Sequence, residues 1–314
     1  MKKLFALLMA LVFACTFLTA VCETATPLRI VCTTFPQYDW TRQLLGDRAD
    51  DVELTLLLDN GIDLHNYQPT ADDIIKIARS DLFIYVGGES DAWVNDLLET
   101  SQNSHVKALS MLACVDAKEE EAVEGMQEEA HECGHAHHEA EYDEHVWTSF
   151  GNMARIVTAV RDTLTAALPE QAATLQANAA SYLLELDALR ADYQATVASA
   201  TGPVLVIADR YPFAYLMREL GVVCYAAFHG CSSETQASFS TQVMLTETVR
   251  DLHLPAVLYV DFGVASVADA VSRATGVPVR RLWSGQVASD TGLSYLDMLR
   301  ENLVSLRAAL GVTG

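Results

Sequence analysis

Histidine and cysteine gather in one acidic segment of the chain. Residues 118–144 hold eleven acidic residues and a single lysine. Within eight consecutive positions of this acidic loop lie His131, Cys133, His135, His137 and His138. Imidazole and thiolate form a borderline-soft donor set that suits Zn²⁺. We therefore expect a long polar loop that binds metal, whereas its acidic residues alone would indicate only a solvated linker.

Two further histidines lie where the chain is expected to be ordered. His65 occurs in a connection between an expected strand and an expected helix, and His145 directly follows the acidic loop. Ligands of parallel α/β sheets bind outside the carboxyl ends of the strands, which is where His65 is expected. A single histidine of this kind is more often a structural hydrogen-bonding group than a ligand. Together the two are candidate metal ligands.

The overall composition is that of an acidic globular protein. The 314 residues are 51% hydrophobic and 20% charged, which excludes a disordered or collagen-like polymer and allows two domains. Lys plus Arg number 20 against 42 Asp plus Glu, so the net charge is −22. Such a charge repels the phosphates of nucleic acids and anionic lipids, and it favours cations as partners.

The chain begins with a segment typical of secretion. Two lysines precede an apolar run from Leu4 to Val21, which predicts a signal peptide over residues 1–22 and an exported protein. We expect a lipid anchor at Cys22. Processing at Cys15, cleavage at the small residues before Cys22, and retention of the apolar run as a membrane anchor are the alternatives.

The rest of the chain alternates strand-like and helical patterns, which predicts an α/β fold of two lobes with parallel sheets. The amino-terminal lobe, residues 23–152 including the acidic loop, has strand-like runs at 28–34, 52–58, 82–86 and 106–109. The carboxy-terminal lobe, residues 201–314, has them at 204–208, 222–227, 256–260 and 279–282.

Residues 153–200 between the lobes have almost no strand signal. Pro169 is expected to begin one long helix that ends before Gly202. Its apolar residues form a single stripe: Leu175, Tyr182, Leu186, Leu189, Tyr193 and Val197. A coiled-coil dimer is one interpretation of this stripe. We favour a rigid connecting helix that contacts both lobes of a monomer.

The cysteines leave more than one pairing open. Besides Cys22, the mature chain keeps Cys32, Cys114, Cys133, Cys224 and Cys231. An odd number leaves at least one thiol free or bound to metal. Cys224 and Cys231 are candidates for a disulfide outside the cell.

Four segments together resemble a known family. They are GIDLHNYQPT (61–70), SDLFIYVGGESDAW (80–93), DEHVW (143–147) and PEQAATLQANAASYLLELDALRADY (169–193). In this order they are similar to the TroA-like metal receptors of bacterial ABC transporters for Zn²⁺ and Mn²⁺, over nearly all of the mature chain. The resemblance implies two lobes joined by one helix, an ion held in the cleft between them, and a membrane permease as partner.

The resemblance also implies that His65 and His145 are the ligands of the amino-terminal lobe. A histidine-rich acidic loop before the second ligand resembles the zinc branch of the family, so Zn²⁺ is the expected cargo and Mn²⁺ the less favoured one.

The carboxy-terminal lobe departs from the family pattern. Where a histidine or glutamate ligand is expected after the first strand, counting from Gly202 gives Asp209 and counting back from Tyr215 gives Arg210. Arginine does not lose its proton to bind metal, so Asp209 is the predicted ligand. An ion pair with Arg210 or a helix cap is the alternative role of Asp209.

A late aspartate ligand of the family also has no counterpart, because Trp283 and Ser284 stand in its place. The loop of residues 228–234 offers imidazole, thiol and carboxylate groups. Cys231 is the predicted fourth ligand, with His229, Glu234 or water as alternatives.

The predicted function is therefore that of an extracytoplasmic solute-binding protein, periplasmic or lipid-anchored on the outer face of the cytoplasmic membrane. It would capture Zn²⁺ for an ABC permease and would not be an enzyme. The nucleophile motif G-x-S-x-G, the Walker loop and G-x-G-x-x-G are missing from the sequence, and Gly87-Gly88 is only a weak phosphate signal. A manganese receptor, a surface adhesin and a zinc-dependent hydrolase are the alternatives.

Overall fold

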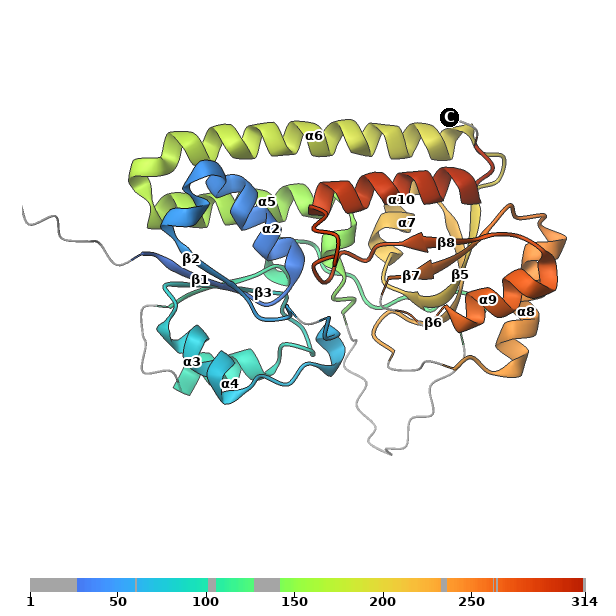
Figure 1. Ribbon diagram of the computed structural model, residues 1–314, viewed down its shortest axis with the longest axis horizontal. Helices are drawn as coiled ribbons and strands as arrows, with labels where there is room; N and C mark the ends of the chain where they lie inside the picture. Colours follow the sequence, from blue (N-terminus) through green and yellow to red (C-terminus); the bar gives the residue numbers. More distant parts are fainter. Residues whose placement is uncertain are drawn as a thin grey trace, which may run out of the picture.

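The computed structural model describes residues 27–59, 61–100, 106–126, 142–232, 236–261, 263 and 265–312. Two α/β lobes lie side by side, and helix α6 runs along both (Figure 1). The expected fold class is confirmed. The signal segment with Cys22, the histidines and cysteine of the acidic loop, and Glu234 lie outside the described residues, so the predictions for them stand as predictions.

The amino-terminal lobe is built on a four-stranded parallel sheet in the order β2-β1-β3-β4. Its strands lie where alternating apolar patterns predicted them: β1 (Arg29–Cys32), β2 (Glu53–Leu56), β3 (Leu82–Tyr85) and β4 (Lys107–Ser110). Its helices are α2 (Phe35–Leu45), α3 (Ala71–Arg79), α4 (Trp93–Thr100) and the short turns η1 (Gly46–Asp51), η2 (Leu64–Asn66), η3 (Leu112–Cys114) and η4 (Val146–Thr148).

The carboxy-terminal lobe repeats this plan with the strand order β6-β5-β7-β8. Its strands are β5 (Val204–Tyr211), β6 (Val223–His229), β7 (Val257–Val260) and β8 (Val279–Leu282). Its helices are α7 (Ala214–Leu220), α8 (Phe239–Asp251), α9 (Ser266–Thr275) and α10 (Tyr295–Ala309). Parallel strands direct their carboxyl ends to the same edge of the sheet, so each lobe presents one loop-lined edge.

Two antiparallel helices connect the lobes. Helix α5 (Phe150–Ala167) is followed by the turn η5 (Pro169–Gln171) and by α6 (Ala172–Ser199), which is 28 residues long. The predicted apolar stripe of α6 is buried against helices α2, α5, α7 and α10 of the same chain. Because the stripe is already covered, it does not form a coiled-coil surface, and α6 is the connecting helix that we expected.

The stripe allows a matched test of stability on one helix. Leu186 is 1% exposed and Leu184 is 72% exposed on α6. Replacing Leu186 with alanine removes buried methyl groups and leaves a cavity, so we expect a loss of about 2–5 kcal/mol in the free energy of unfolding. Leu184→Ala should change it by no more than about 0.5 kcal/mol. Urea unfolding of both variants measures the difference, and similar values for the two would contradict this packing.

The carboxy-terminal segment ties the lobes together near their junction. The Tyr295 hydroxyl donates to the Trp147 carbonyl at 2.7 Å, and the Trp147 indole N–H donates to the Ser284 carbonyl at 3.0 Å. The Phe35 N–H donates to the Gln286 carbonyl at 2.9 Å. These buried bonds place residues 284–286 of the carboxy-terminal lobe against the amino-terminal lobe.

The first part of the acidic loop lies against the carboxy-terminal lobe, although the sequence grouped the loop with the amino-terminal one. The Lys118 N–H donates to the Tyr215 hydroxyl at 2.9 Å, and the Ala226 N–H of edge strand β6 donates to the Glu124 carbonyl at 3.3 Å. This loop stem, residues 118–126, thus crosses from one lobe to the other. The loop returns at residue 143, whose N–H donates to the Lys118 carbonyl at 2.8 Å.

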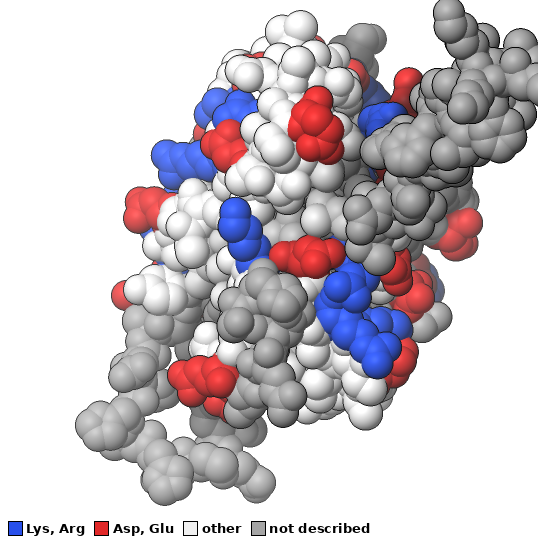
Figure 2. Space-filling view, turned by 90° about the vertical axis from the view of Figure 1, so that its left-hand side faces the viewer, with Lys and Arg blue, Asp and Glu red and all other residues white. Residues whose placement is uncertain are grey.

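The described surface has mixed charge on one face. Figure 2 shows basic and acidic side chains interspersed, with large neutral areas between them. Exposed ion pairs such as Arg48–Asp51 and Lys76–Asp72 occur in the amino-terminal lobe. The described part of this face therefore carries no continuous acidic coat. Within the described ranges, no helix combines the length and apolar character needed to cross a bilayer.

Candidate metal centre

His65 is held by a turn between β2 and α3. The Asp63 carboxylate caps η2 by accepting the His65 N–H at 3.1 Å. Helix α3 then begins with a capping box in which Thr70 and Asp73 bond each other reciprocally. The His65 side chain is 8% exposed, and its Nδ1 atom lies 2.8 Å from the Ser90 hydroxyl oxygen.

His145 immediately precedes η4, between the acidic loop and α5, and is 2% exposed. One carboxylate oxygen of Asp143 lies 2.9 Å from both the backbone nitrogen and the Nδ1 atom of His145. A Cβ added to Gly230 would lie 3.0 Å from the His145 ring, so the carboxy-terminal lobe approaches this ring closely at a residue without a side chain.

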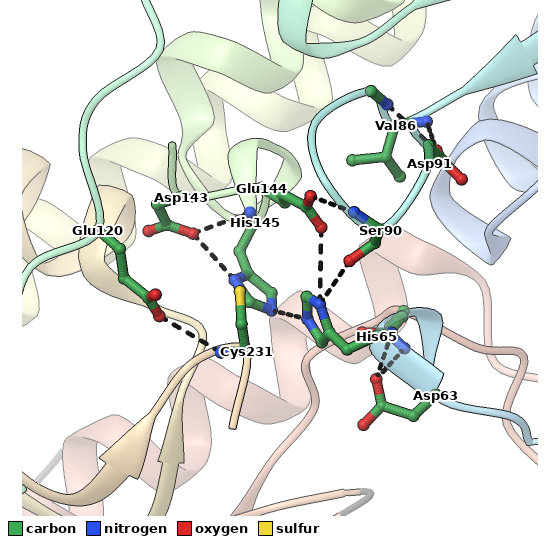
Figure 3. A network of polar contacts seen from close by, with 12 residues as sticks. Asp63, His65, Val86, Ser90, Asp91, Glu120, Asp143, Glu144, His145 and Cys231 are labelled. Carbon is green, nitrogen blue, oxygen red and sulfur yellow. Dashed lines mark hydrogen bonds and ion pairs between the residues drawn. The ribbon is translucent and has the colours of Figure 1, made fainter. Parts of the chain in front are cut away.

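The structure brings three of the four predicted ligands together (Figure 3). The Nε2 atoms of His65 and His145 lie 3.2 Å apart, and the ligand atoms of His65, His145 and Cys231 all lie within 4.8 Å of one another. Cys231 follows β6, so the group combines two side chains of one lobe with one of the other. The two Nε2 atoms are within hydrogen-bond distance of each other, so at most one proton lies between them. A metal cation bound by both nitrogens would replace that proton.

The electrostatics of the histidine pair favour one neutral ring. Burial and the nearby His145 hold the pKa of His65 well below its usual range. Burial also lowers the pKa of His145, but the hydrogen bond that its ring donates to Asp143 and the charges of Asp143 and Glu144 outweigh it, and the net pKa is raised. His65 is therefore in the unprotonated state that metal binding requires.

Cys231 is a thiol in an acidic setting. Burial, followed by the charges of Glu120 and Glu144, raises its pKa well above the usual range. Its backbone N–H donates to Glu120 at 3.3 Å. Both Cys224 and Cys231 are free thiols, so the disulfide considered for them is not formed here. Metal binding at Cys231 thus requires release of the thiol proton.

A small cavity of about 10 Å³ adjoins the histidine pair, about the space of one water molecule. It is lined from both lobes by Asp63, His65, His145, Arg210, Pro212, Gly230, Val260, Ser284 and Gln286. The Arg210 guanidinium forms an ion pair with Asp63, and the Gln286 amide donates to Asp63 at 3.2 Å. These contacts close the cleft beside the candidate ligands.

Asp209 is not brought into the group of three. Its carboxylate accepts the N–H groups of Arg210 at 2.8 Å and Val260 at 3.0 Å, and it lies directly under Gly263. The pairing of β5 with β6 is irregular between Ile207 and Arg210, and Arg210 lines the cavity whereas Asp209 does not. In this structure the Asp209 side chain therefore caps backbone donors, as the alternative role allowed, and its role as a metal ligand stays a prediction.

The residues around the ligands were not singled out from the sequence. Asp143 and Glu144 stood in the DEHVW segment, and their role is apparent only once their oxygens face the two rings. Glu120 was counted only as part of the acidic loop. Ser90 stood in the segment of residues 80–93, and Arg210 was considered as a ligand and set aside. No local pattern marked Gln286 as a position beside the site.

The loop after β3 contains a buried carboxylate that gives the stability a pH dependence. Burial raises the pKa of Asp91 to about 7, although its Oδ2 atom accepts the N–H groups of Val86 and Gly87. The unfolded value is about 3.9, so the folded chain binds this proton more tightly, and this contribution to stability is lost as the pH rises from about 4 to 7.

Asp91→Asn carries no such proton, so its stability lacks this pH dependence. From pH 5 to pH 8 we expect the free energy of unfolding of the variant to rise, relative to that of the parent, by up to a few kcal/mol. Urea unfolding at both pH values measures this difference. The exposed Asp50→Asn is the control, and a pH-independent difference for Asp91→Asn would refute the assignment.

Residues 30–309 match the family described as ZnuA, zinc-uptake complex component A, periplasmic. The chain belongs to this family. The match covers both lobes and the connecting helices, and it includes all three clustered side chains.

Individual relatives agree with the ZnuA assignment. The chain is 30% identical over 288 residues to the zinc-binding lipoprotein AdcA of Streptococcus pneumoniae, covering 89% of this chain and 55% of AdcA. It thus spans about half the length of that relative. It is 24% identical over 289 residues to the high-affinity zinc uptake system protein ZnuA of Bacillus subtilis, covering 90% of this chain and 88% of that protein.

Solved structures share the fold. The Zn(II)-bound ZnuA-like domain of S. pneumoniae AdcA superposes with a TM-score of 0.73 at 25% identity, over 91% of this chain and 99% of the domain. The laminin-binding protein Lmb of Streptococcus agalactiae has a TM-score of 0.74 at 20% identity, over 90% of this chain and 98% of Lmb, and this likeness shows the fold alone.

One zinc-hydrolase spacing does occur in the acidic loop. Residues 131–135 read His-Glu-Cys-Gly-His, which fits H-E-x-x-H. That motif binds zinc when a helix places both histidines on one face, and glycine disfavours a helix interior. These residues lie outside the described ranges, so the spacing supports no catalytic assignment.

Proposed function

We propose that this ZnuA family member is an extracytoplasmic solute-binding protein that captures Zn²⁺ and delivers it to an ABC transporter permease. The observation that carries the proposal is the convergence of His65, His145 and Cys231 at the junction of the lobes. The names of the relatives AdcA and ZnuA support zinc as the cargo.

The donor set favours zinc over manganese. Two imidazole nitrogens and a thiolate are borderline-soft ligands that suit tetrahedral Zn²⁺, whereas Mn²⁺ prefers carboxylate, carbonyl and water oxygens. The cavity beside the two histidines has room for one water molecule as a fourth ligand. Transport also requires release, and a site shared between two lobes loses a ligand when the lobes separate.

The setting in the cell follows from the same proposal. Residues 1–22 would direct export, and a lipid at Cys22 would hold a monomeric protein at the outer face of the cytoplasmic membrane. The periplasmic family description and the lipoprotein name of AdcA support an extracytoplasmic location.

Calorimetric titration of metal-free protein with Zn²⁺ tests the proposal. We expect one tight site formed by the ordered lobes. Because zinc binds the folded cleft preferentially, a thousandfold excess over the dissociation constant should add about 4 kcal/mol to the free energy of unfolding and raise the melting temperature. An unchanged melting curve in saturating zinc would argue against a cleft site.

The same metal-free protein also distinguishes a zinc receptor from a manganese receptor and from a hydrolase. Tighter binding of Mn²⁺ than of Zn²⁺ would identify a manganese receptor. Turnover of ester or peptide substrates by the zinc-loaded protein would identify a hydrolase. Deleting residues 127–141 distinguishes a tight site in that segment from one in the cleft, because the cleft site survives the deletion.

A further inference from the structure

We infer that two adjacent carboxylates position the two histidine ligands, one ring each. Asp143 positions His145, and Glu144 together with the Ser90 hydroxyl positions His65. The inference rests on the proposed function, because it concerns how the same site is prepared for its ion. It assigns roles to three residues that supply no ligand atom.

The two carboxylates serve different rings although they are neighbours in sequence. Asp143 lies 2.9 Å from Nδ1 of His145. The Glu144 Oε2 atom lies 3.5 Å from Nδ1 of His65, and its Oε1 atom accepts the Ser90 N–H at 2.8 Å (Figure 3). Consecutive side chains thus diverge, so a single tripeptide ending in His145 reaches both candidate ligands.

One oxygen of the buried Glu144 carboxylate lacks a hydrogen-bond donor. Its side chain is 3% exposed, and Oε2 has no hydrogen-bond partner within the described structure. A buried carboxylate oxygen without a donor is costly. Nδ1 of His65, at 3.5 Å, is the ion-pair partner that the structure gives this oxygen. The orphaned oxygen therefore points to His65 as its functional partner.

The contacts at Nδ1 of His65 decide which nitrogen of that ring can bind metal. A neutral imidazole carries one N–H, and metal binds the other nitrogen. Acceptors at Nδ1, here the Ser90 hydroxyl and Glu144, keep the proton there and leave the Nε2 lone pair toward His145. Outer hydrogen bonds of this kind fix the tautomer and orientation of ligand histidines and raise their basicity.

The Gly87-Gly88 turn leaves room for the Glu144 carboxylate. Both glycines have positive φ, 89° and 90°. A Cβ at Gly88 would lie 2.5 Å from the Glu144 Oε1 atom, so a side chain there would displace the carboxylate. The same turn places Ser90 so that its N–H contacts Glu144 and its hydroxyl contacts His65. The sequence pattern that gave a weak phosphate signal thus accommodates a protein carboxylate instead.

Glu144→Gln is the most direct test. The Ser90 N–H requires an oxygen at one end of the new amide, so the NH₂ end faces Nδ1 of His65. A donor at that position favours the tautomer protonated at Nε2, which blocks metal binding. We expect a shift of the His65 tautomer, seen by ¹⁵N NMR of the metal-free imidazoles, and a zinc affinity about 10–100-fold below that of the parent.

Ser90→Ala is the second variant, and it removes the closest acceptor without adding a charge or bulk. Glu219→Gln is the matched control, because Glu219 also accepts a backbone N–H and a serine hydroxyl in a partly buried position, from Gly151 and Ser149. The control should leave the His65 tautomer and zinc affinity unchanged.

An unchanged His65 tautomer in both Glu144→Gln and Ser90→Ala overturns the inference. The tautomer is read without metal, so it decides the positioning role even if the parent fails to bind zinc. That failure would refute the proposed function alone.

Discussion

His145→Ala is expected to lower the zinc affinity of this protein by at least about 100-fold, more than the loss of an outer hydrogen bond to a ligand. His145 is the most buried of the three candidate ligands, and its Nε2 atom lies 3.2 Å from that of His65. Without the ring, the ion keeps one imidazole and one thiolate. His65→Ala should have a similar effect. Competition titration against a chromophoric zinc chelator measures both.

The loss must be separated from unfolding, because the Asp143 carboxylate would be left buried without its partner. The melting temperature of each metal-free variant gives that separation. His253→Asn is the control: His253 is an exposed histidine in the left-handed conformation, with φ of 51°, which asparagine tolerates. Parental affinity in a folded His145→Ala variant would remove this ring from the site.

Cys231→Ser should also weaken zinc binding by at least about 100-fold, and it should weaken binding of the softer Cd²⁺ even more. A hydroxyl does not ionise as a thiol does, and soft thiolate ligands contribute most to soft metals. The thiolate-to-metal charge-transfer absorption of the Co²⁺-loaded protein should disappear. This spectroscopic loss distinguishes a ligand from a residue that only supports the loop.

Cys224→Ser is the matched control, since Cys224 is a free buried thiol of the same lobe that lies outside the group of three. It should keep the charge-transfer band. If Cys231→Ser retains both the band and the affinity, the ligand of the carboxy-terminal lobe lies elsewhere. Asp209→Asn would then be examined next, and Glu120→Gln after it.

The sequence by itself determined the architecture of this protein. The eight strands of the described ranges lie within a few residues of the apolar runs that predicted them, and the stripe of α6 is buried against both lobes. These features depend on period and composition along a local segment, which the chain displays directly. His65 and His145 were also named as candidates, because the segments that contain them resemble the metal-receptor family.

Only the tertiary structure decided which groups meet at the site. Asp209 and Arg210 are neighbours on β5, yet Arg210 lines the cavity whereas Asp209 caps backbone donors. Counting residues from either end of the strand does not show which of the two side chains reaches the cavity. Glu144 and His65 are 79 positions apart, so their contact depends on how two loops fold onto each other. Side-chain direction and long-range distance are set by sheet register and lobe packing, which no local pattern encodes.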